Sequence, residues 1–145
     1  MFVVFVAAFG EEVLYRGIMW RALMPKGLLQ TVIITSLLYG ILHLGRFVSA
    51  RPWSEAVYLA MLAICSGFAY AALRWRTGSI WPVVLFHFAL NLAGDISTPD
   101  AVPYLLPLIL ITSTLGFVVY GLFLLRNPRV RADGRLTTQE LACVR

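Results

Sequence analysis

The sequence has little charge and few of the residues that cross-link small proteins or bind metals. Only 13% of its 145 residues are charged and 60% are hydrophobic, whereas soluble domains average about 45–50% apolar residues. A soluble core of this size cannot bury so much apolar surface, so lipid must be part of the solvent. The two cysteines, Cys65 in an apolar run and Cys143 near the C-terminus, indicate neither a disulfide framework nor a zinc cluster.

Other signals are also absent. The first ten residues are apolar but have no basic segment before them, and glutamates follow directly, which argues against a cleaved signal peptide. The sequence contains no internal repeat, and its apolar runs lack the alternation of barrel strands. Because backbone groups find no partners in hydrocarbon, helices are the expected spanning form. We therefore predict an all-α fold, a polytopic transmembrane helix bundle.

Five apolar runs approach the length of about 20 helical residues that crosses a bilayer. The predicted spans cover residues 2–24, 28–48, 55–73, 78–93 and 102–125. Together they form one transmembrane domain, residues 1–126, in a multi-pass protein of the cell membrane. Residues 127–145 form an arginine-rich tail, which the positive-inside rule places in the cytoplasm. The tail has no interleaved aromatic residues, so we expect no nucleic-acid partner.

Ionisable residues occur within the predicted spans. Glu11, Glu12 and Arg16 interrupt the first span, and the only two histidines, His43 and His87, lie inside two others. A charge at the bilayer centre costs roughly 2.5–3.5 kcal/mol on insertion scales. Polar groups retained at that cost usually face the bundle interior and carry function.

The spacing of these residues indicates which of them share a helix face. Glu12 and Arg16 are four residues apart, so they can form an ion pair on one face. Glu11 is turned about 100° away from Glu12 and can face a different partner. Gly40 has no side chain, so it would allow another helix to approach closely.

Four side chains are predicted to converge. With alternating topology, Glu11, His43, His87 and Asn91 fall in the same half of the membrane, nearer the outer face by the positive-inside rule. A carboxylate beside an imidazole can take a proton from water. A second imidazole with an amide can donate to an oxyanion, which is worth roughly 2.7–4 kcal/mol per donor. This set of groups is typical of amide hydrolysis by an activated water.

Zinc is an alternative for the same residues. One glutamate and two histidines, here Glu11, His43 and His87, are an accepted catalytic zinc ligand set. The H-E-x-x-H helix of zinc proteases is absent. From the residues alone, both metal-free and zinc-dependent hydrolysis remain open.

Three motifs resemble those of a known family. Residues 11–16 match E-E-x-x-x-R, residues 39–43 match F-x-x-x-H with Tyr39 in place of Phe, and residues 87–91 match H-x-x-x-N/D. In this order, each on an apolar helix, they resemble the CAAX prenyl endopeptidase and bacteriocin-processing (CPBP, or Abi) family of intramembrane proteases. Residues 76–82 also resemble the segment that leads into the last motif.

The resemblance implies a role for each residue. Glu11 would be the catalytic carboxylate, with His43 as its partner in activating water. His87 and Asn91 would form the oxyanion site. The remaining two motif residues would support the site, Glu12 as a second carboxylate and Arg16 as its counter-ion. Tyr39 is expected to be a packing residue.

The resemblance also bears on cofactors and partners. The family is often labelled metalloendopeptidase, but its members resemble glutamate-dependent enzymes, so we predict no cofactor and keep zinc as the alternative. The expected partners are the lipid bilayer and a membrane-anchored protein or peptide substrate. Family members usually carry further spans before the first motif, so this chain is expected to be a short or N-terminally truncated member.

Two other functions fit the residues less well. A non-catalytic immunity or scaffold protein of the membrane is suggested by the early start of the chain relative to the first motif. A proton-coupled transporter subunit is suggested because intramembrane Glu, His and Arg also mark proton relays. The sequence lacks the inverted repeat that is typical of such transporters.

Overall fold

A computed structural model of the chain describes residues 1–49, 52–96 and 106–126. All regular elements in these ranges are helices and none is a strand, so the predicted all-α bundle is confirmed. The predicted tail, residues 127–145, lies outside the described residues. The same is true of residues 102–105, with which the last predicted span begins.

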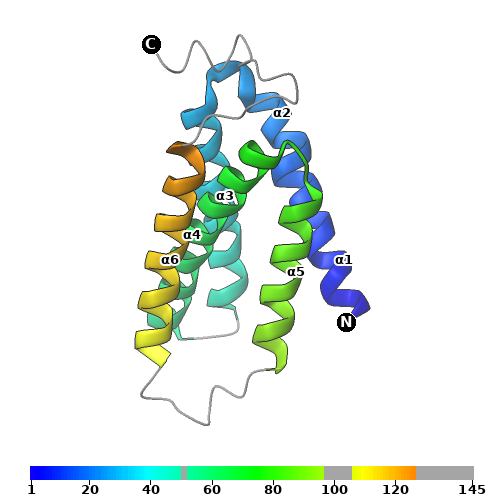
Figure 1. Ribbon diagram of the computed structural model, residues 1–145. Helices are drawn as coiled ribbons and strands as arrows, with labels where there is room; N and C mark the ends of the chain where they lie inside the picture. Colours follow the sequence, from blue (N-terminus) through cyan, green and yellow to red (C-terminus); the bar gives the residue numbers. More distant parts are fainter. Residues whose placement is uncertain (50–51, 97–105, 127–145) are drawn as a thin grey trace.

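The helices follow one another with short connections. Their bounds are α1 (Phe2–Glu12), the π-helix η1 (Val13–Met19), α2 (Trp20–Leu23), the 3₁₀-helix η2 (Met24–Lys26), α3 (Leu28–Val48), α4 (Trp53–Thr77), α5 (Trp81–Ile96) and α6 (Leu106–Arg126). Helices α3, α4, α5 and α6 run side by side in alternating directions, and the N-terminal helical run lies along α5 (Figure 1).

The helix ends agree with the predicted spans to different degrees. Helix α3 has the predicted bounds, whereas α4 extends beyond residues 55–73 at both ends. It ends at Thr77, and the next residue, Gly78, has a φ of 69°, in the left-handed region that favours glycine at helix C-termini. Helix α5 therefore begins three residues later than predicted. The first run is divided by η1, and nothing in the sequence predicted a π-helix there.

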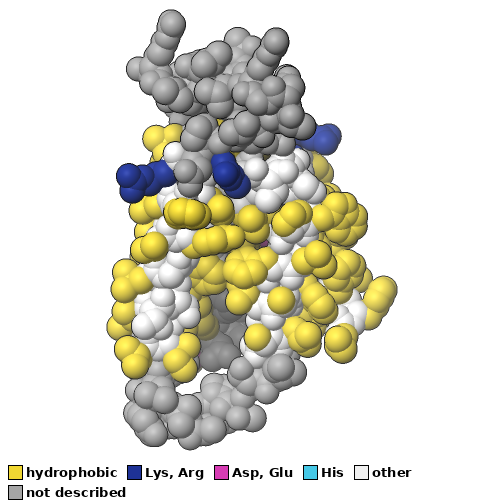
Figure 2. All heavy atoms as spheres, viewed as in Figure 1, with side chains coloured by type: hydrophobic (Ala, Val, Ile, Leu, Met, Phe, Trp, Pro, Cys, Tyr) yellow, Lys and Arg dark blue, Asp and Glu magenta, His cyan; other side chains and the backbone are white. Residues whose placement is uncertain are grey.

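Three helical segments are long and apolar enough to cross a membrane: Leu28–Gly45, Trp53–Thr77 and Leu108–Arg126. The apolar part of α5, Trp81–Gly94, is shorter, and the pieces of the N-terminal run are each too short when taken singly. Hydrophobic side chains cover the visible outer face of the bundle, and Lys and Arg side chains gather near one end of it (Figure 2). Five spans therefore remain a prediction, of which three are supported by length and composition.

Helix α4 is the central element, because it packs against α3 on one side and α6 on another. Its buried face is built mainly from small residues, which let helix backbones approach closely. Gly40 of α3 meets this face. A β-carbon at Gly40 would overlap the Ile64 side chain and lie 3.0 Å from the Ala60 carbonyl oxygen. The expected close approach at Gly40 is therefore confirmed.

Candidate active site

A buried ion pair joins the start of the π-helix to α4. Glu12 and Arg16 are both completely buried. Arg16 Nη1 donates to Glu12 Oε1 at 3.3 Å, and Nε lies 3.3 Å from Oε2 without hydrogen-bond geometry. Arg16 Nη2 also donates to the backbone oxygen of Gly67, at 2.8 Å. The expected pair on one helix face is present, and it is tied to a second helix.

Three tyrosine rings surround the Arg16 guanidinium. Its Cζ lies 5.5 Å from the ring centre of Tyr15, 4.9 Å from that of Tyr39 and 5.3 Å from that of Tyr70. Such contacts are favourable for a cation that is removed from water. Gly67 completes the enclosure, because a β-carbon there would lie 3.3 Å from Arg16 Nη2. The cation is therefore held in place beside Glu12.

His87 is held by two hydrogen bonds and a stacked ring. Its Nδ1 lies 2.9 Å from Glu12 Oε1. Since a carboxylate only accepts, this nitrogen carries the hydrogen in the neutral ring, and Nε2 is then an acceptor. The Tyr39 hydroxyl, 3.2 Å from Nε2, donates to it. The Tyr70 ring stacks on the imidazole with centroids 5.1 Å apart. A buried chain of hydrogen bonds therefore runs from Glu12 through His87 to Tyr39.

Glu11 faces the two histidines. Its Oε2 lies 3.7 Å from His43 Nε2 and 3.8 Å from His87 Nε2. This oxygen is buried and has no hydrogen-bond partner among the described residues, although 27% of the side chain is exposed. His43 Nδ1 donates to the Tyr39 carbonyl oxygen at 2.8 Å, so its Nε2 is an acceptor in the neutral ring. The structure thus brings Glu11, His43 and His87 together from α1, α3 and α5.

Asn91 is placed differently from the other three predicted catalytic residues. It lies on α5, one turn beyond His87, and is half-buried. In the part of the chain that the structure describes, no hydrogen bond links its amide to Glu11, His43 or His87. The structure therefore does not draw Asn91 into the hydrogen-bonded group.

Sequence reasoning missed three contributors to this group. Tyr39 was expected only to pack, but its hydroxyl binds His87. The signal was the tyrosine itself, since a buried phenol needs a hydrogen-bond partner and the phenylalanine of the motif does not. Tyr70 and the Gly67 carbonyl belong to α4, which carries none of the motifs. Nothing in the sequence pointed to them.

The zinc alternative involves the same three side chains, Glu11, His43 and His87. Within the described ranges, no group of three or more His, Cys, Asp and Glu residues could hold a metal ion. Of the three candidate ligands, His87 uses one ring nitrogen for Glu12 and the other for the Tyr39 hydroxyl. Metal binding by Glu11, His43 and His87 would therefore require the Tyr39 hydroxyl to leave His87 Nε2, and zinc at these residues stays an alternative prediction.

The comparison with known families is decisive for identity. The family model described as type II CAAX prenyl endopeptidase Rce1-like matches residues 1–93, which is well over half of the 145-residue chain. The chain belongs to this family. The matched region contains all three motifs and ends within α5, so the resemblance inferred from the motifs is confirmed. The Rce1-like family and the apolar helices together make this chain a membrane protein of a protease family.

The other two comparisons, with curated proteins and with solved structures, gave no match. The assignment therefore holds at the level of the Rce1-like family.

Proposed function

We propose that this Rce1-like protein is an intramembrane endopeptidase that hydrolyses a peptide bond of a membrane-associated substrate. Glu11 and His43 would activate the attacking water. The observation that carries this proposal is the buried Glu11 Oε2, which lacks a partner among the described residues and faces His43 Nε2 at 3.7 Å. Both atoms are acceptors when the carboxylate is ionised and the imidazole neutral.

Two acceptors at this separation can hold one water. Each would accept one of its hydrogens, which leaves an oxygen lone pair directed away from them and toward a substrate carbonyl. As the new carbon–oxygen bond forms, Glu11 or His43 takes one proton from the water. The same proton then goes to the departing amine as the carbon–nitrogen bond breaks, which is general base and then general acid catalysis.

His87 and Asn91 are proposed to stabilise the oxyanion. The hydrogen bond from Nδ1 to Glu12 means that His87 Nε2 donates only when the ring is an imidazolium. The Asn91 amide can donate in any state. Tyr39, bonded to the same Nε2, is proposed as a residue that positions His87.

No step of this reaction runs through a metal. In the proposed reaction Glu11 and His43 act on water directly, and His87 keeps its hydrogen bonds to Glu12 and the Tyr39 hydroxyl. Oxyanion donors and a positioned base supply the needed stabilisation in such a mechanism.

A comparison of new peptide termini in the membrane proteome tests the proposal without knowledge of the substrate. Wild type, Glu11→Gln and Glu55→Gln would be produced in a host that lacks the gene. Glu55 is an exposed carboxylate in the first turn of α4 and serves as the matched control. We expect termini that appear with wild type and Glu55→Gln and vanish with Glu11→Gln. Termini that persist with a folded Glu11→Gln protein would refute the proposal.

A further inference from the structure

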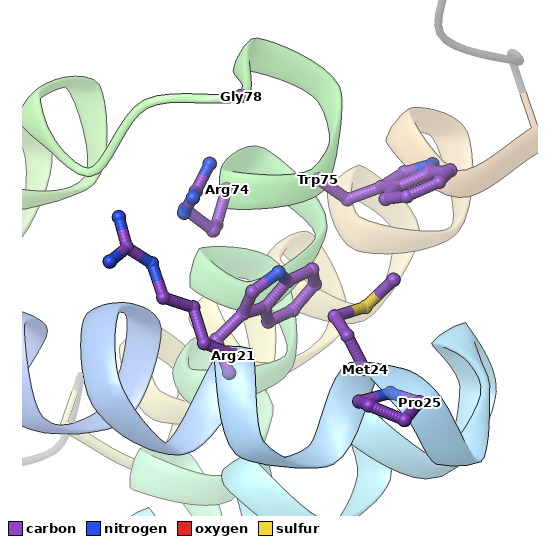
Figure 3. Close-up of a pocket in the computed structure, with 7 residues that line it drawn as sticks. Arg21, Met24, Pro25, Arg74, Trp75 and Gly78 are labelled. Atoms are coloured by element: carbon purple, nitrogen blue, oxygen red, sulfur yellow. The ribbon is translucent and has the colours of Figure 1, made fainter. Parts of the chain in front are cut away.

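A second polar feature lies at the end of the bundle, apart from the candidate active site. A pocket of about 350 Å³ opens where α2 and η2 meet the C-terminal end of α4. Arg21 and Arg74 lie beside each other on one side of it, and Trp75, Met24 and Pro25 lie on the other (Figure 3). Its lining is therefore divided into a cationic part and an apolar part.

The charges around this pocket are of one sign. Several basic residues lie at the helix ends on this side of the bundle: Arg21, Lys26, Arg74, Arg76 and Arg126. Among described side chains, the acidic ones lie elsewhere. Glu11 and Glu12 belong to the candidate active site, and Glu55 lies at the opposite end of α4. An anion would meet attraction here with no nearby described carboxylate to oppose it.

The chemistry of the lining indicates an amphipathic anion. Arginine presents a planar set of donors that matches phosphate oxygens. The indole rings of Trp20 and Trp75 also line the pocket, and tryptophan is enriched at the level of lipid headgroups. Basic pockets between transmembrane helices are sites for anionic headgroups. The volume is at the lower end for ligand pockets, which span about 300–1,000 Å³, and suits a headgroup rather than a whole lipid.

We propose that this pocket binds the phosphate headgroup of an anionic phospholipid, with Arg21 and Arg74 as the phosphate ligands. The acyl chains would leave along the apolar side, past Trp75 and Met24. Arg74 Nε also donates to the backbone oxygen of Arg16, at 3.2 Å. Arg74 would therefore contact both the bound headgroup and the backbone of Arg16, the π-helix residue that pairs with Glu12.

Tryptophan fluorescence gives a direct test, because two of the four tryptophans line the pocket. In a Trp53→Phe/Trp81→Phe background, Trp20 and Trp75 are the remaining indoles. The purified protein would be placed in nanodiscs that contain either brominated phosphatidylglycerol or brominated phosphatidylcholine, which quench on contact. We expect quenching by brominated phosphatidylglycerol at a several-fold lower mole fraction. Equal quenching by the two lipids would overturn the proposal.

Charge variants separate a built site from general surface attraction. Arg21→Gln should abolish the lipid preference, and Arg21→Lys should retain only part of it, because lysine cannot bind phosphate in a bidentate way. Arg126→Gln removes the same charge at the same end but outside the pocket lining, and should retain the preference. An equal loss in Arg126→Gln and Arg21→Gln would mean diffuse electrostatic attraction and would overturn the site.

Inorganic phosphate distinguishes the source of the anion. At constant ionic strength, adding it should leave the preference for phosphatidylglycerol unchanged. Loss of the preference would overturn the lipid as the ligand and point to a soluble phosphate compound. None of these readouts depends on peptide hydrolysis. The results therefore test the lipid site independently of the proposed peptidase activity.

Discussion

At the scale of single residues, two neighbouring glutamates have different surroundings. Glu12 is fully buried against Arg16 and His87. Glu11 is partly exposed, and its buried oxygen faces His43 and His87 without a hydrogen bond. The rotation of about 100° between adjacent helical residues accounts for the difference. The Glu12 carboxylate is therefore bound by two protein side chains, whereas one oxygen of Glu11 is left for the proposed contact with water.

The Tyr39 hydroxyl can be removed without loss of the ring. Tyr39→Phe should lower stability by about 1 kcal/mol, the usual value of one hydrogen bond, and should slow but not abolish hydrolysis. In ¹⁵N NMR of the His87 ring, the Nε2 resonance should move while Nδ1 stays protonated, because Glu12 still holds it. Tyr70→Phe keeps its ring against His87 and is the control. An unchanged Nε2 resonance in Tyr39→Phe would contradict the positioning role.

Removal of the buried Arg16 guanidinium should strongly lower the stability of the protein. Arg16→Met leaves Glu12 buried with His87 as its remaining partner, and removing one member of a buried pair costs about 3–5 kcal/mol. The unfolding midpoint in detergent should fall accordingly. The double variant Glu12→Gln/Arg16→Met should recover part of the loss. Arg126→Met, at an exposed position, should change little, and a similar loss in both arginine variants is incompatible with this account.

Chelation tests the zinc alternative at the same residues. Hydrolysis by the purified enzyme should persist in EDTA and in phenanthroline, because the proposed reaction uses Glu11 and His43 directly on water and both ring nitrogens of His87 already have protein partners. The measurement is the rate at which the wild-type peptide termini form, before and after dialysis against chelator. Activity that is lost and then restored by zinc would establish the alternative ligand set.

At the scale of helices, the site depends on how closely α3 and α4 approach. Gly40 and the small face of α4 allow the contact, and the contact carries Tyr39 toward Arg16 and His87. The π-helix follows directly after Glu12, and π-helical turns occur frequently at functional sites. Helix packing therefore places groups that no single motif contains.

An alanine at Gly40 tests this packing. Gly40→Ala places a methyl group against Ile64 and the Ala60 carbonyl, and overpacking of this kind costs about 1–3 kcal/mol. Gly116→Ala is the control, because a β-carbon there meets nothing within 4 Å. In a helix interior that change should be neutral or stabilising. Equal unfolding midpoints for the two variants would show that the α3–α4 approach does not require glycine.

At the scale of the whole molecule, the alternating helices separate two ends of the bundle. The basic residues of η2 and of the C-termini of α4 and α6 gather at one end, for which the positive-inside rule predicts the cytoplasmic side. The candidate active site lies between the ends, on α1, α3 and α5. Orientation therefore decides from which side a substrate approaches.

Cysteine labelling measures this orientation. In a Cys65→Ala/Cys143→Ser background, Ser54→Cys and Thr77→Cys mark the two ends of α4, both at exposed positions. A membrane-impermeant maleimide added to intact cells should label Ser54→Cys and leave Thr77→Cys unlabelled until the cells are opened. The reverse pattern would place the basic end outside.

Properties that depend on neighbours along the chain could be predicted from the sequence. The all-α class, the bounds of α3 and the Glu12–Arg16 pair follow from apolar run length and from four-residue spacing. The family, too, could be inferred from short motifs, each contained within one helix. All of these are local features, which the order of residues determines directly.

Contacts between distant residues were decided only by tertiary structure. The Tyr39 hydroxyl on His87, the Gly67 carbonyl on Arg16 and the facing of Glu11 toward His43 join different helices. Periodicity defines the face of each helix but not the neighbour that it meets or the depth at which helices cross. The packing of helices also decides that Asn91 lies outside the hydrogen-bonded group and that a basic pocket forms beside α4. Close packing against α4 sets these distances, because its small residues determine how near each neighbouring helix can come.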